Sequence, residues 1–535
     1  SFDIDDLTNC GISTYRIWIG MSDVEYCDDD DPRGYNWGCN QAGNINYGSP
    51  TTATIKANPD VINWTVWDEH INNPIYRWRT GYITDTVFGT MVGALNSKGI
   101  LPVLCLRNRD EYNYPAWAPN PPTSTEDLNE WWQYCFAVAY WFNVRNSYGV
   151  THFEVHNEPD LSSQGWGGTE AQYAQLLVPY AYDAVKTAND IAGINTYIHA
   201  PVVSNYNSTY IANSLDNADA KIAMVDYHNY DNDPTTSVTT VKTTIAAHNS
   251  DGITEPIWLS EWGTYTSSYD NMSRAILTAQ QLMTFSEQGV EGVTIFGMYD
   301  WGSSSGLVKS DGTKTETYYA YRLMIRGLGG AKDRMQFTSS GVSGDIMVTR
   351  GGGKVYIIVI NGGATIQTDV SALGVDDGDV NIWEYSSTIK DTIVATPTVS
   401  NGQFTFTAPA SGIALAEITP SPTVITLVSF TATPLAGAVL LEWETASEID
   451  TAGFNLWRSK TGADPYTKLN TDLIPARGGL TTGTRYSYVD DAVTSDVTYW
   501  YKLEDVDTHG VSTFHGPVVA AAGQGYWLYL PLILS

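Results

Sequence analysis

The sequence predicts an α/β fold, a (β/α)8 TIM barrel, followed by two all-β sandwich domains. Short apolar runs alternate with helical patterns over residues 1–330, and the helical pattern is lost over residues 331–520. The chain has 535 residues, which is too many for one hydrophobic core and indicates several domains. Hydrophobic residues make up 43%, which is enough to build such cores.

Seven apolar runs within residues 1–330 are typical of buried strands: Tyr15–Ile19, Ile100–Leu106, His152–His156, Thr196–Val203, Met224–His228, Pro256–Ser260 and Gly292–Phe296. Amphipathic stretches lie between them, including Thr84–Ser97, Glu126–Asn143, Glu170–Thr187 and Met272–Glu287. Strands that alternate with helices imply a parallel sheet with crossover helices. Eight units of roughly 31 residues make about 250 residues, the size of a closed barrel.

The eighth strand has two interpretations. Asp3–Gly11 resembles the end of a helix that precedes the run ISTYRIWIG, so the first strand is expected upstream of Ser1. The alternative is a strand at Ile75–Arg79, which would bring the number of barrel strands to eight.

Residues 21–73 form a long insertion after the run that contains Arg16. Loops after barrel strands build the active face, so this insertion is expected to wall one side of a cleft. Aromatic side chains in a polar loop have little local apolar surface to bury against, and some are expected to serve as stacking platforms. We expect this of Trp37 in particular, among Tyr26, Tyr35, Trp37, Tyr47, Trp64 and Trp67.

Two further features of the insertion concern its chemistry. Cys27 and Cys39 flank a polar loop and are a candidate disulfide if the compartment is oxidising. Between them, Asp28–Asp31 are four consecutive carboxylates. Four in a row cannot all face one calcium ion, so a solvated acidic loop is predicted. No metal ion and no cofactor is expected.

Two strand-rich domains are predicted after the barrel. Alternating runs such as VYIIVI and FTFTAP indicate a β-sandwich over residues 331–419, and TPSPT at 419–423 is typical of a linker. Residues 424–520 resemble a fibronectin type III-like module. The apolar tail 521–535 is too short to span a bilayer, and is either a last strand or a sorting or anchoring signal.

The charge of the chain excludes some partners. The formal net charge is −31, with only 28 Lys and Arg residues, so the chain repels phosphate backbones and nucleic acid is not an expected partner. No stretch of about 18 apolar residues occurs, so no membrane span is expected. Ser1 opens directly into FDIDDLTNCG, which is typical of a chain whose leader has been removed. A secreted or cell-surface location follows.

Two glutamates follow apolar strands. Glu158 lies in FEVHNEPD at 153–160, and Glu261 lies in PIWLSEWGTY at 256–265. They are 103 residues apart, or roughly three βα units, so their strands are expected to be separated by two others across one barrel mouth. A single glutamate at the end of a strand is often structural, but two glutamates that face each other across one barrel mouth indicate a catalytic pair. Paired carboxylates suit glycosidic cleavage, in which one carboxyl protonates the leaving oxygen and the other attacks the anomeric carbon.

The motifs HNEP and SEWG are similar to those of clan A glycoside hydrolases, within which family 5 is the best match and family 39 a close competitor. The resemblance covers residues 1–330, and residues 331–419 resemble a sandwich often appended in this clan. It implies that Glu158 is the acid/base, that Glu261 is the nucleophile, and that Asn157 bonds the substrate 2-hydroxyl.

The resemblance assigns four more residues. Arg16 matches the arginine that bonds the nucleophile, which would lower the pKa of that carboxyl. His228 and Tyr230 match a His-x-Tyr pair after the sixth strand, and Trp301 matches an aromatic platform after the eighth. Three of them have a structural alternative: a buried ion pair for Arg16, a core histidine for His228 and plain packing for Trp301.

The chain departs from the family 5 pattern in two places. Arg107 or Asn108 stands where a histidine is common, and His156 replaces a small or apolar residue. These departures bear on the family and substrate more than on the mechanism. The first hypothesis is therefore a retaining endo-β-glycanase acting on glucan or xylan. The alternatives are an exo-β-glycosidase such as a β-xylosidase, and a non-catalytic carbohydrate-binding or cell-surface structural protein.

Overall fold

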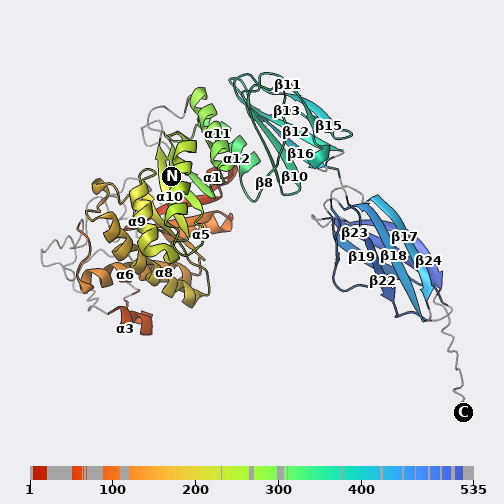
Figure 1. Cartoon of the computed structure of the whole chain (residues 1–535), viewed down its shortest axis with the longest axis horizontal. Coiled ribbons are helices and arrows are strands. Elements are labelled where there is room, and N and C mark those ends of the chain that lie inside the picture. The colour runs from red at the N-terminus through yellow and green to blue at the C-terminus, as the bar shows by residue number, and fades with distance from the viewer. Residues whose placement is uncertain are drawn as a thin grey trace, which may run out of the picture.

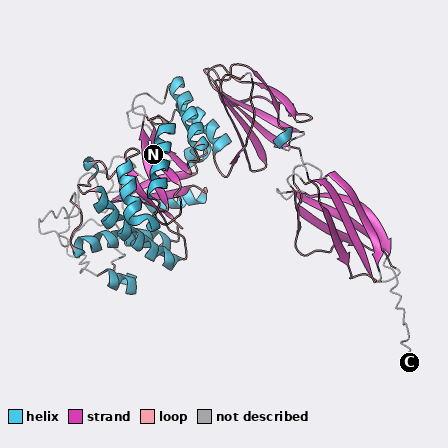
Figure 2. Cartoon of the chain, viewed as in Figure 1, coloured by secondary structure: helices cyan, strands magenta, loops and turns pink. Residues whose placement is uncertain are grey.

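A computed structural model describes most of the chain. It covers residues 4–20, 51–62, 64, 68, 88–108, 120–230, 232–263, 270–297, 306–309, 311–340, 342–373, 375, 377–421, 426–435, 437–448, 451–463, 465–479, 482–494, 497–507 and 512–521. Figure 2 shows helices gathered around the strands of the N-terminal part, and strands dominating the two parts that follow.

The N-terminal part is a near-closed barrel. Its described strands form a seven-stranded parallel sheet in the order β1-β2-β3-β4-β5-β6-β7. Figure 1 shows the helices of this part lying around those strands. Every residue of β3 and β6 is buried, as expected where helices cover one side of a parallel sheet and the barrel interior fills the other. The predicted TIM-barrel fold is confirmed, with strands β1 (Thr14–Gly20), β2 (Leu101–Arg107), β3 (His152–Val155), β4 (Tyr197–Val203), β5 (Met224–Tyr230), β6 (Ile257–Gly263) and β7 (Gly292–Ile295).

The edge strands of this sheet, β1 and β7, approach each other. β1 pairs with β2 along its whole length, from Thr14 opposite Leu101 to Gly20 opposite Arg107, so no strand separates them. The alternative strand at Ile75–Arg79 lies outside the described residues, and a first strand upstream of Ser1 stays a prediction.

Helices surround the barrel and begin where the sequence supplies caps. In α6, the Ser124 hydroxyl accepts from the Asp127 amide at 3.0 Å, and the Asp127 carboxylate accepts from the Ser124 amide at 3.1 Å. Asp233 caps α10, with Pro234 at its first position. The helices are α1 (Ile4–Cys10), α3 (Thr52–Ala57), α5 (Phe88–Ser97), α6 (Thr125–Tyr140), α7 (Glu170–Gln172), α8 (Val178–Ala192), α9 (Ser208–Ala218), α10 (Pro234–His248), α11 (Met272–Glu287) and α12 (Glu316–Leu328).

A first β-sandwich follows the barrel. One sheet has the order β13-β12-β16-β10-β9-β8 with β14 on β12, and the other pairs β11 with β15. Phe404 and Phe406 point inward from β15 and stack at 5.8 Å between ring centroids. The strands are β8 (Asp333–Arg334), β9 (Asp345–Gly351), β10 (Lys354–Ile360), β11 (Thr365–Asp369), β12 (Gly378–Tyr385), β13 (Lys390–Ala395), β14 (Thr398–Val399), β15 (Gln403–Thr407) and β16 (Ile413–Pro420).

The outer face of this sandwich packs on α12 of the barrel. A Cβ at Gly327 would lie 2.7 Å from the Ile358 side chain, so glycine allows the helix backbone to reach the sheet. Across the same interface, the Glu316 carboxylate accepts from the Tyr385 hydroxyl at 2.6 Å and from the Lys390 ammonium at 2.7 Å. The hydrophobic core of the barrel therefore extends onto the outer face of this sandwich, whose interior forms a core of its own.

A second sandwich has its own core. Its sheets have the orders β17-β18-β22 and β20-β19-β23-β24, with β21 on β19. Trp443 stacks on Tyr486 at 5.0 Å in the core between them. Its fibronectin type III-like character stays a prediction. The strands are β17 (Thr426–Leu435), β18 (Ala438–Ser447), β19 (Thr451–Ser459), β20 (Thr467–Lys468), β21 (Ile474–Pro475), β22 (Arg485–Asp490), β23 (Thr498–Asp507) and β24 (Ser512–Ala521).

Cys105 and Cys135 are fully buried free thiols in the barrel. The tail after Ala521 lies outside the described residues. Among the helices that the structure describes, none is both long and apolar enough to cross a membrane.

Candidate active site

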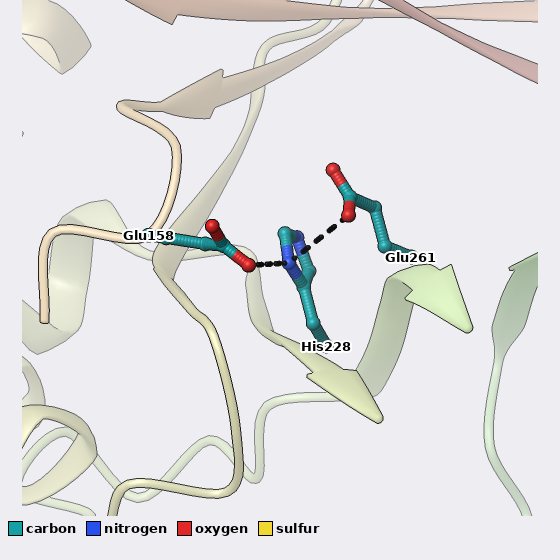
Figure 3. Close-up of side chains that lie close together, drawn as sticks. All are labelled: Glu158, His228 and Glu261. Atoms are coloured by element: carbon teal, nitrogen blue, oxygen red, sulfur yellow. Dashed lines mark hydrogen bonds and ion pairs between the residues drawn. The ribbon is translucent and has the colours of Figure 1, made fainter. Parts of the chain in front are cut away.

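Glu158 and Glu261 meet at the C-terminal ends of the barrel strands. Glu158 lies three residues beyond β3, and Glu261 lies near the end of β6. The strands β4 and β5 lie between them in the sheet, as the spacing predicted. One oxygen of each carboxylate lies within 4.8 Å of the other, and His228 lies between the two (Figure 3). Glu158 is 9% exposed and Glu261 5%.

The chain makes a sharp turn to present Glu158. His156 and Glu158 have φ values of 67° and 46°, in the left-handed region that costs a non-glycine residue about 1–3 kcal/mol. Hydrogen bonds fix this conformation: the Glu158 amide donates to the Val202 carbonyl at 2.8 Å, and the His156 ring bonds the Asn108 side chain at 2.7 Å. Strain of this kind persists where the surroundings enforce it, and it often marks functional sites.

Arg16 joins the strands beneath the two glutamates. Its guanidinium contacts Glu261, donates to both carboxylate oxygens of Glu154 at 2.9 and 2.6 Å, and donates to the Asn157 side-chain oxygen at 2.9 Å. Burial alone would lower the pKa of Arg16, but Glu154 and Glu261 raise it well above its ordinary value. Arg16 is thus a permanent buried cation that forms an ion pair and contacts the candidate nucleophile.

Glu261 is held as a carboxylate. Burial would raise its pKa, but the charges of His228 and Arg16 and the hydrogen bond from Tyr230 outweigh that effect and lower it. The Tyr230 hydroxyl donates to Glu261 Oε2 at 2.6 Å. An ionised, immobilised carboxylate is what attack on an anomeric carbon requires.

His228 bridges the pair. Its Nδ1 lies 2.8 Å from Glu158 Oε1 and 3.4 Å from Glu261 Oε2 (Figure 3). Burial would lower the pKa of His228, but the neighbouring carboxylates raise it above its ordinary value. Among the described residues Glu158 has weaker support than Glu261, because the one hydrogen bond that they supply to its second oxygen comes from the Asn157 side-chain amide, at 3.5 Å. The two carboxyls therefore lie in different environments, as acid and nucleophile must.

The sequence analysis did not identify two residues of this site, Glu154 and Trp18. Glu154 is fully buried and binds Arg16, and a charge within an apolar strand indicates a buried partner. Trp18 lies two residues after Arg16 on β1 and is 36% exposed, with the Arg107 guanidinium 4.5 Å from its ring. Strand alternation places Trp18 on the same side as Arg16, a signal that was available in the motif RIW.

The aromatic platforms have mixed outcomes. Trp37 and Trp301 lie outside the described residues, as do Cys27, Cys39 and Asp28–Asp31. Trp64, from the same insertion, is buried and stacks on Tyr140 of α6 at 5.1 Å. It therefore packs on the outer helical layer, because α6 offers an apolar surface that the sequence of the loop did not reveal.

Glu158, His228 and Glu261 have a spacing that a metal ion can use. The contacts do not favour that use. Glu261 already contacts the buried Arg16 cation and accepts from Tyr230. A metal ion bound there would lie close to the Arg16 guanidinium in a buried environment, where two positive charges repel each other strongly.

The hydrogen bond from Tyr230 leads to a pH prediction. A Tyr230→Phe variant should lose about tenfold in kcat/KM, because a bond to a charged group is lost. The pKa of Glu261 should rise, because the removed donor favoured the ionised form. The acidic limb of kcat/KM against pH should therefore move to higher pH.

A matched control lies on the same strand. The Tyr227 hydroxyl bonds Ser237, away from the glutamates, so Tyr227→Phe should leave the limb unmoved. An unchanged limb in Tyr230→Phe would mean that the hydroxyl does not tune Glu261.

Comparisons with known proteins show the fold. No protein-family profile and no curated protein matches the chain. Among solved structures, a glucosidase from Croceicoccus marinus has a TM-score of 0.53 at 14% identity, over 78% of this chain and 92% of that one. A glycoside hydrolase family 30 subfamily 8 xylanase from Clostridium acetobutylicum has a TM-score of 0.51 at 12% identity, over 78% and 93%.

A third similar structure is the family 51 arabinofuranosidase from Xanthomonas axonopodis pv. citri, with a TM-score of 0.50 at 14% identity, over 78% of this chain and 89% of that one. At such identities the likeness concerns architecture alone. The shared 78% is close to the combined length of the barrel and the first sandwich. Membership of family 5 or family 39 stays a prediction.

Proposed function

We propose that this protein is a retaining glycoside hydrolase that cleaves β-glycosidic bonds of a polysaccharide by double displacement. The observation that carries the proposal is the placement of Glu158 and Glu261, with one oxygen of each within 4.8 Å. Retaining enzymes separate the carboxyls by about 5–5.5 Å, and inverting enzymes by about 6.5–9.5 Å to admit a water.

The two environments support the assignment of roles. Glu261, with Arg16, Tyr230 and His228 around it, attacks the anomeric carbon. Glu158 protonates the departing oxygen and then removes a proton from the water that releases the glycosyl-enzyme intermediate. Asn157 lies beside Glu158 and is proposed to bind the 2-hydroxyl of the same sugar, where hydrogen bonds strengthen in the transition state.

An endo-acting enzyme on a glucan or xylan is the form that we propose. A polymer needs stacking surfaces beyond the cleaved bond, and the half-exposed ring of Trp18 supports one such surface. Trp37 and Trp301 are proposed as further platforms. An exo-β-glycosidase would use the same glutamates in a pocket that is closed at one end.

Hydrolysis assays with purified protein test this proposal. Xylan, mixed-linkage glucan, cellulose and laminarin should be incubated separately, and product sizes followed together with the anomer that forms first by proton NMR. Endo action predicts early oligosaccharides with a β-configured reducing end, whereas exo action predicts early monosaccharide. A first product of α configuration would contradict retention, and no product from any β-glycan would favour a carbohydrate-binding or structural protein.

A further inference from the structure

Three carboxylates cluster at the end of the barrel opposite Glu158 and Glu261. Asp219 lies between α9 and β5, and Asp251 and Glu255 lie between α10 and β6. Both loops lead into the N-terminal ends of their strands. One carboxylate oxygen of each residue lies within 4.8 Å of the other two.

Asp219 is fixed as an anion. Its Oδ2 accepts from the Ser250 amide at 2.6 Å, from the Ser250 hydroxyl at 2.8 Å and from the Asp251 amide at 3.0 Å. Burial would raise the pKa of Asp219, but these donors outweigh it and lower that pKa. The residue therefore carries its charge at neutral pH, although it is only 4% exposed.

The Asp219 and Glu255 carboxyls face each other. Asp219 Oδ1 and Glu255 Oε2 are both buried, and in the described part of the chain no donor reaches either, apart from a proton shared between the two carboxyls. Glu255 is 3% exposed, and burial with the nearby Asp219 and Asp251 raises its pKa to about 7. No lysine, arginine or histidine of the described residues forms an ion pair with these three carboxylates. Buried oxygens of this kind need either a proton or a cation between them.

We propose that Asp219, Asp251 and Glu255 form a divalent cation site, with calcium as the expected ion. Calcium prefers clustered carboxylate oxygens and completes its shell with backbone carbonyls and waters, which suits a cluster with one exposed member, Asp251. The ion would join the loop before β5 to the loop before β6 and so brace the base of the barrel. This inference lies beyond the proposed hydrolysis and does not rest on it.

A shared proton between Asp219 and Glu255 is the competing explanation, and the two make opposite predictions. A bound cation stabilises the fold more as pH rises, because its ligands must be deprotonated. A proton shared between the two carboxyls stabilises the fold less as pH rises. A folded pKa of about 7 for Glu255, above its ordinary 4.5, contributes stability that is lost as pH rises through 7.

Thermal unfolding of the full chain tests the site. The protein should be stripped with a chelator, freed of it, and melted at about pH 8 with and without excess calcium chloride, with calcium titration calorimetry alongside. The wild type should gain about 3 °C in Tm with calcium, because a ligand that binds the folded state stabilises it. Glu255→Gln should lose both the gain and the binding heat.

Glu291→Gln is the matched control. Glu291 is exposed and precedes β7 at the same end of the barrel, so the variant should respond to calcium like the wild type. Two outcomes would overturn the proposal: a wild type whose Tm ignores calcium, or a Glu255→Gln variant that keeps the full gain. A wild type that calcium leaves unchanged, and that loses stability through pH 7 while Glu255→Gln does not, would establish the proton pair instead.

Discussion

Glu261→Ala should lower kcat on every substrate by on the order of 10⁴-fold, because it removes the carboxylate that attacks the anomeric carbon. Sodium azide should restore turnover and yield the α-glycosyl azide from a β-glycoside. The small anion occupies the space left by the carboxylate and attacks once, so the configuration inverts while Glu158 still protonates the leaving oxygen. Product NMR after azide rescue measures this outcome directly.

The fold of this variant needs its own check, since Glu261 contacts the buried Arg16. Arg16 keeps Glu154 and Asn157 as partners, so the barrel should remain folded. Glu291→Ala supplies the control, because it removes a carboxylate at the far end of the barrel. Wild-type rates for Glu261→Ala would remove this residue from the mechanism, and a retained azide product would remove it from the role of nucleophile.

Much of the barrel could be predicted because its strands are buried on both sides and appear as apolar runs. Both glutamates could be placed for the same reason. Each follows or ends such a run, and the carboxyl ends of parallel strands share one face. The number of residues between Glu158 and Glu261 then predicted that two strands lie between theirs, as the sheet order shows.

The support beneath the glutamates could not be predicted in full. Arg16 and Glu154 are 138 residues apart and meet only because β1 and β3 both flank β2. A family resemblance could identify Arg16. That Glu154 is its ion-pair partner depends on which side chains point into the barrel, and the sequence does not specify this. The bridging position of His228 likewise depends on distances that no spacing in the sequence specifies.

The surroundings of Trp64 illustrate the limit for loops. Some aromatic rings of the polar insertion were expected to face the cleft, but the ring of Trp64 packs on Tyr140 of α6. The composition of a loop indicates that an aromatic ring needs an apolar surface to pack against. It does not indicate which surface of the fold lies within reach. The buried carboxylates Asp219 and Glu255 are a second case, because their loops belong to successive βα units and meet only at the base of the barrel.

Glu158→Ala should separate substrates by their leaving groups. Polysaccharide hydrolysis should fall by about 10²–10⁴-fold, the contribution of general acid catalysis, because a sugar alkoxide leaves poorly without a proton. An aryl glycoside with an acidic phenol needs little protonation, so its first step should stay fast. Removal of the general base should then slow release of the glycosyl enzyme and produce a burst of phenol.

Azide again distinguishes the role. It should attack the accumulated glycosyl enzyme on Glu261 and release a β-glycosyl azide, because two successive displacements restore the original configuration. His228 loses one carboxylate partner in this variant and keeps Glu261, so an Asn157→Ala variant, which leaves the Glu158–His228 contact in place, controls for general disturbance of the site. Asn157→Ala should show neither the burst nor azide rescue. Equal losses on aryl glycoside and polysaccharide in Glu158→Ala, with no burst, would show that Glu158 is not the acid/base, and an α-glycosyl azide would exchange the roles of the two glutamates.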